Sequence, residues 1–193
     1  MLQLTDVSEE LTTMTHFFVQ GVAIAGTIVL GTTISIAATT PADPTQIAQN
    51  TMVEAILGAH NQYRAEVDVP PLAWSDALAG DAQEWADYLA SLGGDELEHA
   101  ENTGQGENLW MGTAGFFSYT EMVTSWGEEQ QNFIGGTFPD VSATGNWSDV
   151  GHYTQMVWRE TTQVGCGMAT AGGNNILVCR YSPPGNFVGE FVY

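Results

Sequence analysis

The sequence predicts an α+β domain, and three observations lead to that prediction. Apolar residues recur at the three- and four-residue spacing of amphipathic helices through the first part of the domain. From Gln163 onward the residues alternate between apolar and polar, and Gly, Val and Tyr are frequent, which is typical of strands. Helices that come first and strands that come late favour α+β over a doubly wound sheet, in which the two would alternate. A length of 193 residues suits one such domain plus a targeting segment.

The targeting segment is expected at residues 1–40. Its second half, residues 17–40, carries no charged side chain and is long enough to span a bilayer. Small residues at 35–37 fit the cleavage site of an export signal, although acidic residues precede the apolar run where basic ones are usual. We interpret residues 1–40 as an export signal, with an N-terminal membrane anchor as the alternative. Residues 41–50 are interpreted as a linker and 51–193 as the domain.

Two amphipathic helices are expected at the start of the domain. The first ends near Asp68–Pro71, and its apolar side is formed by Met52, Ala55, Ile56, Ala59 and Tyr63. Ser75 is a suitable N-cap for the second helix, because its hydroxyl can accept a bond from the first turn. Gly93 and Gly94 would end that helix, since glycine adopts the left-handed backbone of a helix C-terminus.

Loops, two further helices and strands complete the expected order. A glycine-rich stretch spans residues 104–115, with an apolar strand after Gly106–Leu109. A third helical pattern lies around residues 119–126, and a loop at 135–146 leads to a short helix at 152–158. The remainder, from Gln163, is expected to form strands.

The two cysteines are expected to form a disulfide across a hairpin. If Gly172 and Gly173 form a two-residue turn, counting outward places Cys166 directly opposite Cys179. That pair falls at a non-hydrogen-bonded position, where the Cα atoms come close enough for a disulfide. Two reduced, buried thiols are the alternative. The disulfide would indicate an oxidising compartment, as an export signal does.

The charge balance excludes several classes of partner. The chain has 23 acidic side chains, three arginines and no lysine, and its formal net charge is -20. Nucleic-acid binding is not expected, because the chain offers almost nothing to neutralise phosphates. Anionic lipid surfaces are disfavoured for the same reason, so membrane contact would be limited to the N-terminal segment.

Three histidines of the domain are candidate functional residues: His60, His99 and His152. Two imidazoles with two carboxylates would suit a borderline-soft cation such as Zn²⁺, with water completing its shell. The spacing of these residues along the chain does not by itself bring them together.

Four motifs resemble signatures of one protein family. Residues 151–161 (GHYTQMVWRET) and 176–187 (ILVCRYSPPGNF) are similar to the two longer signatures of the CAP superfamily, and His60–Arg64 and Gly106–Leu109 to the two shorter ones. That superfamily comprises cysteine-rich secretory proteins, venom antigens and plant pathogenesis-related proteins. Each short motif is weak alone, but the four occur in the family's order between residues 52 and 193.

The resemblance implies a three-layer α-β-α sandwich with a large open cleft (the CAP or SCP domain). It further implies that the cleft carries His99, Glu107, Glu129 and His152, with Glu129 on the third helix beside Glu128. In that picture the two imidazoles bind a divalent metal, expected to be zinc. The carboxylates either hold metal-bound waters or orient the ring N–H groups. His60, Asn61 and Arg64 would be structural, connecting the first helix to the later strands through hydrogen bonds.

The function implied is that of a secreted binding protein, and its alternatives stay open at this point. Its extracellular ligand would be a lipid, a sterol, a glycan or a protein. Five apolar residues near the Gly-Glu-Asn motif could either line the ligand site or belong to the core: Leu109, Trp110, Met111, Phe116 and Phe117. A metal-assisted hydrolase is the alternative, since a metal-bound water with a nearby Glu as general base could act in such a pocket. A structural envelope protein, with the N-terminal segment retained as an anchor, is the third hypothesis. Catalysis does not follow from the family.

Overall fold

A computed structural model describes residues 43–193 of the chain. The segment interpreted as an export signal or anchor, residues 1–40, lies outside the described residues. The elements are, in order, α1 (Pro44–Glu66), β1 (Ala73–Trp74), α2 (Asp76–Ser91), β2 (Gly106–Thr113), α3 (Tyr119–Gly127), the 3-10 helices η1 (Glu128–Asn132) and η2 (Trp147–Asp149), α4 (Gly151–Val157), β3 (Gln163–Ala171) and β4 (Asn174–Ser182).

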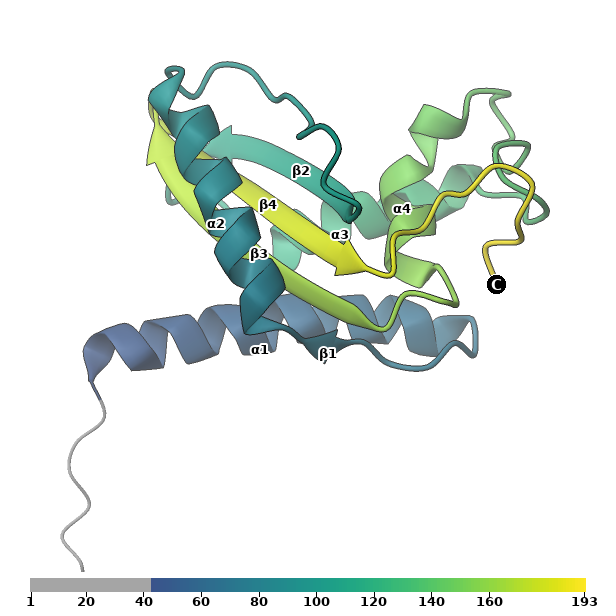
Figure 1. Cartoon of the computed structure of the whole chain (residues 1–193), viewed down its shortest axis with the longest axis horizontal. Coiled ribbons are helices and arrows are strands. Elements are labelled where there is room, and N and C mark those ends of the chain that lie inside the picture. The colour runs from purple at the N-terminus through teal and green to yellow at the C-terminus, as the bar shows by residue number, and fades with distance from the viewer. Residues whose placement is uncertain (1–42) are drawn as a thin grey trace, which may run out of the picture. The chain divides into compact units, whose positions relative to one another are not determined.

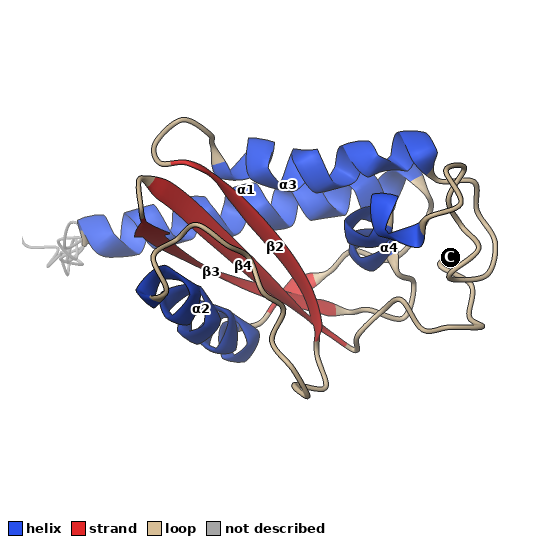
Figure 2. Cartoon of the chain, turned by 90° about the horizontal axis from the view of Figure 1, so that it is seen from above, coloured by secondary structure: helices blue, strands red, loops and turns tan. Residues whose placement is uncertain are grey.

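The described strands form a sheet between two layers of helices (Figure 1 and Figure 2). The strand order is β1-β3-β4-β2, in which β1 runs parallel to β3 and the other neighbours are antiparallel. Helix α2 covers one face, whereas α1 and α3 lie on the other with α4 packed against both. The predicted three-layer α-β-α sandwich is therefore confirmed.

Helix α1 begins earlier than the sequence pattern predicts. The side chain of Asp43 accepts a hydrogen bond from Thr45 N, and Pro44 occupies the first turn, where its missing N–H costs nothing. The helix therefore takes in most of the segment 41–50 that was interpreted as a linker. Proline is typical of turns, but directly after an Asp it is also a helix start signal.

The second layer of the sandwich follows the expected pattern more closely. Ser75 caps α2 by accepting a bond from Leu78 N, as expected. Strand β2 includes the Gly-Glu-Asn-Leu motif instead of following it, so most of the glycine-rich stretch is extended chain. The two-residue strand β1 was not predicted, because it is too short to show a period.

Two clusters of buried residues, one on each side of the sheet, form the core. The larger lies with α1, α3 and α4 and includes Ile56, Met122, Trp126, Trp158 and Tyr181. The smaller lies between α2 and the sheet and is formed by Ala82, Ala86, Leu89, Leu109, Ile176 and Val178. Burial of this apolar surface on both faces is the main force that holds the helices to the sheet.

The β3–β4 hairpin has the predicted register. Ala171 pairs with Asn174 around the Gly172-Gly173 turn, both glycines have positive φ, and Cys166 pairs with Cys179. The two cysteines form a disulfide with their Cα atoms 4.1 Å apart. The predicted disulfide is thus confirmed, and it lies in the interior of the domain.

The length and the polarity of the helices decide whether one of them could span a membrane. Helix α1 has 23 residues, but many of its side chains are polar. Within residues 43–193, no helix is both long and apolar enough to cross a bilayer.

Candidate functional site

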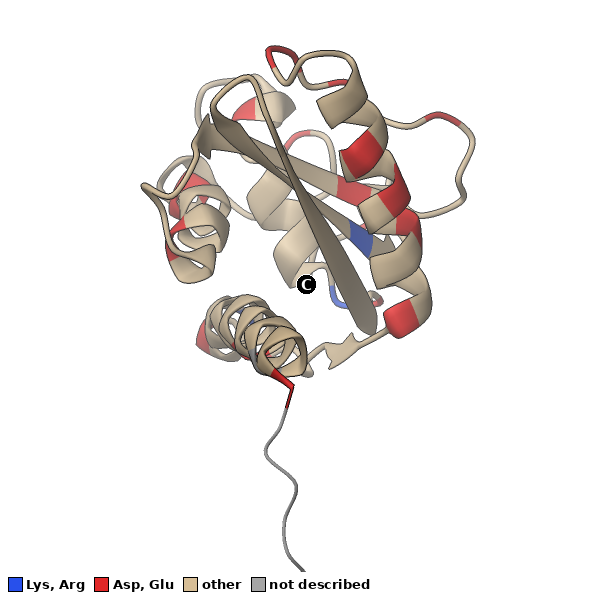
Figure 3. Ribbon diagram, turned by 90° about the vertical axis from the view of Figure 1, so that its left-hand side faces the viewer, with Lys and Arg blue, Asp and Glu red and all other residues tan. Residues whose placement is uncertain are grey.

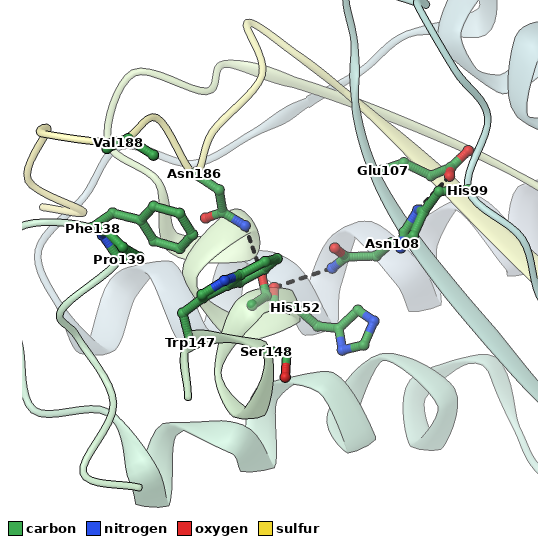
Figure 4. Close-up of a pocket in the computed structure, with 11 residues that line it drawn as sticks. His99, Glu107, Asn108, Phe138, Pro139, Trp147, Ser148, His152, Asn186 and Val188 are labelled. Atoms are coloured by element: carbon green, nitrogen blue, oxygen red, sulfur yellow. Dashed lines mark hydrogen bonds and ion pairs between the residues drawn. The ribbon is translucent and has the colours of Figure 1, made fainter. Parts of the chain in front are cut away.

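A pocket of about 480 Å³ lies beside the start of α4. Its walls come from the segment before β2, from β2 itself, from the loop between η1 and η2, from η2 and α4, and from the chain after β4 (Figure 4). The residues that line it are His99, Glu107, Asn108, Phe138, Pro139, Trp147, Ser148, Gly151, His152, Asn186 and Val188. Three of the four residues expected in the cleft are among them, and the fourth, Glu129, reaches the pocket through His152.

The first pair in this pocket is His99 with Glu107. His99 Nδ1 donates to Glu107 Oε1 at 2.6 Å, and Ala100 N donates to the same oxygen at 3.1 Å. The other carboxylate oxygen forms an ion pair with Arg180 Nη2 at 2.9 Å. The Glu107 side chain is 7% exposed whereas that of His99 is 63% exposed. A buried carboxylate thus holds a solvent-facing imidazole, and Arg180 offsets its charge.

The second pair is His152 with Glu129. His152 Nδ1 donates to Glu129 Oε1 at 2.6 Å, while the backbone N–H groups of His152 and Tyr153 donate to Oε2 at 2.9 and 3.1 Å. The ring of Trp126 stacks on the His152 ring with centroids 6.0 Å apart. Glu129 lies in η1, not on α3 as expected, because α3 ends at Gly127. The chain path there directs Glu129 toward His152.

Both histidines have the same orientation toward their carboxylates. Because each Nδ1–H donates to a glutamate, the Nε2 atom of each ring carries the free lone pair. This is the usual arrangement of metal-binding histidines, in which a carboxylate fixes the tautomer and increases the basicity of the other nitrogen. Of the two roles suggested for the carboxylates, the geometry favours orienting the rings.

The number of side chains that could bind a metal together is small. In the part of the chain that the structure describes, no three His, Cys, Asp or Glu side chains come together as a metal-binding group. His99 and His152 line the same pocket with Asn108 drawn between them in Figure 4. The pocket therefore offers a cation at most these two imidazoles, with water or a ligand needed to complete its shell, and not a closed site of four protein ligands.

The five apolar residues considered for ligand binding are located elsewhere. Leu109 is buried against α2, and Trp110 packs edge-to-face on Phe117. None of the five lines this pocket, whose apolar wall is formed by Phe138, Pro139, Trp147 and Val188. The pocket lies at the start of β2, where Glu107 and Asn108 line it, whereas the five apolar residues follow in the chain.

Two asparagines of the pocket were missed although they lie in the quoted motifs. Asn108 donates to the backbone oxygen of His152 at 3.1 Å. Asn186 donates to Gly151 O at 2.9 Å and accepts from Thr154 Oγ1 at 2.8 Å. Both hold α4, which carries His152, at the edge of the sheet. Their positions, directly after Gly106-Glu107 and Gly185, were the available signal.

The residues interpreted as structural bind one strand and several loops. Tyr181 OH donates to His60 Nε2 at 2.8 Å, which joins α1 to β4. Asn61 exchanges two hydrogen bonds with the backbone of Leu72, just before β1. Arg64 donates to four backbone oxygens, those of Pro70, Met156, Trp158 and Thr161. All three were expected to connect the first helix to the later strands, but only His60 does so. Asn61 and Arg64 lie closer to the end of α1, where the loops after α1 and α4 are their neighbours.

We expect His60 to make folding stability depend on pH. Burial lowers the pKa of His60 to about 4, from the ordinary value of 6.5. Between these pH values the unfolded chain binds a proton at His60 and the folded chain does not. The contribution of His60 to the free energy of unfolding is therefore fully present above pH 6.5 and is lost as the pH falls toward 4. The free energy of unfolding should fall by about 2 kcal/mol from this cause when the pH is lowered from about 7.5 to about 5.

Urea unfolding of the wild type and of His60→Gln across this range isolates the effect. Protonation of carboxylates changes both proteins alike, so the difference between their unfolding free energies should shrink by about 2 kcal/mol on acidification. A constant difference would mean that the pKa of His60 is not lowered in the folded state.

The sequence is similar to proteins of one family. A sequence model of the cysteine-rich secretory protein family (CAP) matches residues 57–181. Pathogenesis-related protein 1A of Nicotiana tabacum is 37% identical over 148 residues, which are 76% of this chain and 83% of the tobacco protein. Venom allergen 5.02 of Dolichovespula maculata is 35% identical over 164 residues, covering 72% of this chain and 74% of the allergen.

Solved structures share the fold. The crystal structure of NaASP2 with Zn²⁺ superposes with a TM-score of 0.63 at 24% identity, over 75% of this chain and 85% of that one. The crystal structure of MpPR-1i gives a TM-score of 0.51 at 21% identity, over 75% of this chain and 93% of that one.

Proposed function

The chain belongs to the cysteine-rich secretory protein (CAP) family, and on that premise we propose that it is an extracellular binding protein whose pocket holds a divalent cation, preferably Zn²⁺, and an organic ligand. The observation that carries the proposal is the pair of histidines in one pocket, each bonded through Nδ1 to a carboxylate. In this role His99 and His152 bind the cation through Nε2, and Glu107 and Glu129 hold the rings. A bound cation would supply a positive centre for a polar group of the ligand.

The walls of the pocket suggest the kind of ligand. Phe138, Pro139, Trp147 and Val188 form an apolar side, while Asn108 and the histidines form a polar one. A cavity of about 480 Å³ with such a division suits a molecule with a polar head and an apolar body. Among the four ligand classes considered, a lipid or a sterol fits this description better than a glycan or a protein.

Hydrolysis is the weaker proposal for a reason visible in the site. A general base needs a free carboxylate within reach of the metal-bound water. Glu107 uses both oxygens, on His99 and Arg180, and Glu129 uses both on His152 and the backbone of Tyr153. These contacts favour binding over catalysis, and they equally disfavour a purely structural role, which would not need oriented imidazoles.

The proposed location is outside the cytoplasm. A disulfide buried in the core requires an oxidising compartment in which to form. The family description, and relatives named as pathogenesis-related proteins and venom allergens, support secretion.

The test of the cation site is calorimetric titration of Zn²⁺ into metal-stripped protein. We expect saturable binding by the wild type, and at least a 100-fold weaker affinity in His99→Ala/His152→Ala, because both imidazole ligands are lost. Glu96→Gln/Glu160→Gln, which removes two exposed carboxylates away from the pocket, controls for nonspecific attraction to the acidic surface. Equal affinities in the wild type and the histidine variant, or no binding by either, would disprove the cation site.

A further inference from the structure

A second groove, of about 520 Å³, lies between α2 and the segment that leads into β2. It shares no lining residue with the pocket described above. Its floor is Arg180 on β4, one wall is the exposed side of α2, and the other is the chain from Ala100 to Gln105. Three features of this groove point to the same kind of ligand.

The first feature is a set of buried polar atoms without partners. Arg180 is 3% exposed and its Nη2 pairs with Glu107, but its Nε and Nη1 atoms have no hydrogen-bond acceptor among the described residues. Gln105 Oε1 is buried without a donor among the same residues, although its Nε2 donates to Asp81 at 2.6 Å. Unpaired buried donors and acceptors are costly. A hydroxyl group both donates and accepts, so it is the kind of group that would satisfy these atoms of two residues that line the groove.

The second feature is an aromatic wall. The rings of Trp85 and Tyr88 stack with centroids 4.7 Å apart and planes inclined by 28°. Trp85 Nε1 donates to Glu98 O at 2.9 Å, which fixes the indole, and Tyr88 is 44% exposed. Because the two rings face each other, only the outer face of this stack is open, and Tyr88 is its more exposed member. That face offers a flat apolar surface to a ligand with a flat apolar face. The face of a pyranose ring that carries axial C–H bonds has this shape.

The third feature is the charge around the groove. Asp81, Glu84 and Glu101 line it, whereas the charge of Arg180 is already offset by Glu107. Figure 3 shows acidic residues along α2 beside a basic residue of the sheet. An anionic ligand would be repelled by these carboxylates. A neutral ligand rich in hydroxyl groups would instead donate hydrogen bonds to them.

We propose that this groove binds a neutral carbohydrate, with one pyranose ring stacked on Tyr88, which Trp85 supports from behind, and its hydroxyl groups bonded to Arg180 and Gln105. The carboxylates of the groove accept further hydroxyl hydrogens and exclude sulfated or phosphorylated sugars. A bare metal cation would satisfy the carboxylates but not the unpaired N–H groups of Arg180. Neither the cation site nor its ligand is needed for this second site.

The test uses neutral hexasaccharides of glucose, mannose and N-acetylglucosamine as probes, followed by saturation-transfer NMR and tryptophan fluorescence. At least one of them should bind the wild type, and Tyr88→Ala should weaken that binding at least tenfold, because the exposed ring of the stack is lost. Arg180→Gln should weaken it similarly. Since Arg180 is buried and its replacement could unfold the domain, Tyr88→Ala is sufficient as a test by itself.

Two control variants show whether the saccharide occupies this groove. Tyr193→Ala removes a tyrosine of similar exposure, 40%, outside the groove and should bind the saccharide like the wild type. His152→Ala, whose ring contacts Glu129 and Trp126 and no residue of the groove, should also bind it unchanged, so its weaker zinc binding does not affect this result. The proposal is overturned if no saccharide binds at about 10 mM, if Tyr88→Ala binds as tightly as the wild type, or if Ca²⁺ binds in the groove and the saccharides do not.

Discussion

Replacement of Arg64 by Met should lower the unfolding free energy by about 5 kcal/mol, one of the two largest effects that we expect from the structure. Arg64 is fully buried, and its guanidinium donates to Pro70 O at 2.6 Å and to the oxygens of Met156, Trp158 and Thr161 at 2.9 Å. Methionine fills the same space but leaves these carbonyl groups buried without their donors.

The four carbonyl groups explain why the loss should be large. Met156 and Trp158 belong to the end of α4, where backbone oxygens have no partner within the helix, and Thr161 lies just before β3. Arg64 therefore joins the end of α1 to the helix that carries His152. Burial lowers the pKa of Arg64 to about 10, which leaves it charged at neutral pH.

Replacement of Arg64 by Lys separates the contribution of the positive charge from that of the planar guanidinium geometry. An ammonium group keeps the charge but cannot reach all of these oxygens with the planar donors of a guanidinium, so Arg64→Lys should lose about 3 kcal/mol. Urea unfolding monitored by tryptophan fluorescence measures both variants. If lysine were as stable as arginine, charge alone would be sufficient. If methionine were also as stable, the carbonyl groups would have to be hydrated.

The hairpin shows which parts of this fold can be predicted from the sequence. The register of β3 and β4 follows from a Gly-Gly turn and the two-residue period of a strand, both of which are local. The Ser75 cap depends only on the next three residues, so it could also be predicted from the sequence. Glu107 and His152 could be selected because they lie within motifs.

Contacts between distant segments could not be predicted in this way. The pairing of Glu107 with Arg180 joins residues 73 positions apart, and its existence depends on β2 lying beside β4. Glu129 rather than Glu128 meets His152 because α3 changes into a 3-10 helix at Gly127, which alters the direction of each following side chain. The sheet order has no local signal, and Gly127 marks the end of α3 without showing which direction the chain takes after it.

The second large effect concerns two glycines of β3, and it explains why α2 lies so close to the sheet. Gly165 and Gly167 point toward α2 from the same face of the strand. A Cβ atom on Gly165 would overlap the backbone of Ser75 and Ala79, and one on Gly167 would lie 2.8 Å from Gln83 Cβ and overlap the backbone of that residue. These are atoms of the helix backbone, which a change of side-chain rotamer cannot move.

We therefore expect Gly165→Ala/Gly167→Ala to lose about 5 kcal/mol of unfolding free energy, because α2 must move away from the sheet. That movement would separate Ala82, Ala86 and Leu89 from the strands against which they are buried. Gly80→Ala, in the middle of α2, is the matched control. A Cβ there meets nothing within 4 Å, and alanine favours a helix over glycine by about 1 kcal/mol, so this variant should be more stable than the wild type.

Thermal and urea unfolding of the wild type and the two variants tests this prediction. The comparison shows whether a loss of stability comes from close packing of α2 on β3 or from the addition of a methyl group in general. Loss in the β3 variant together with gain in Gly80→Ala would establish that the contact between α2 and β3 depends on the missing side chains. Equal stability of the β3 variant and the wild type would show that α2 can shift at little cost. In that case the wall of the second groove, which α2 supplies, would not be held rigidly enough to stack on a sugar ring.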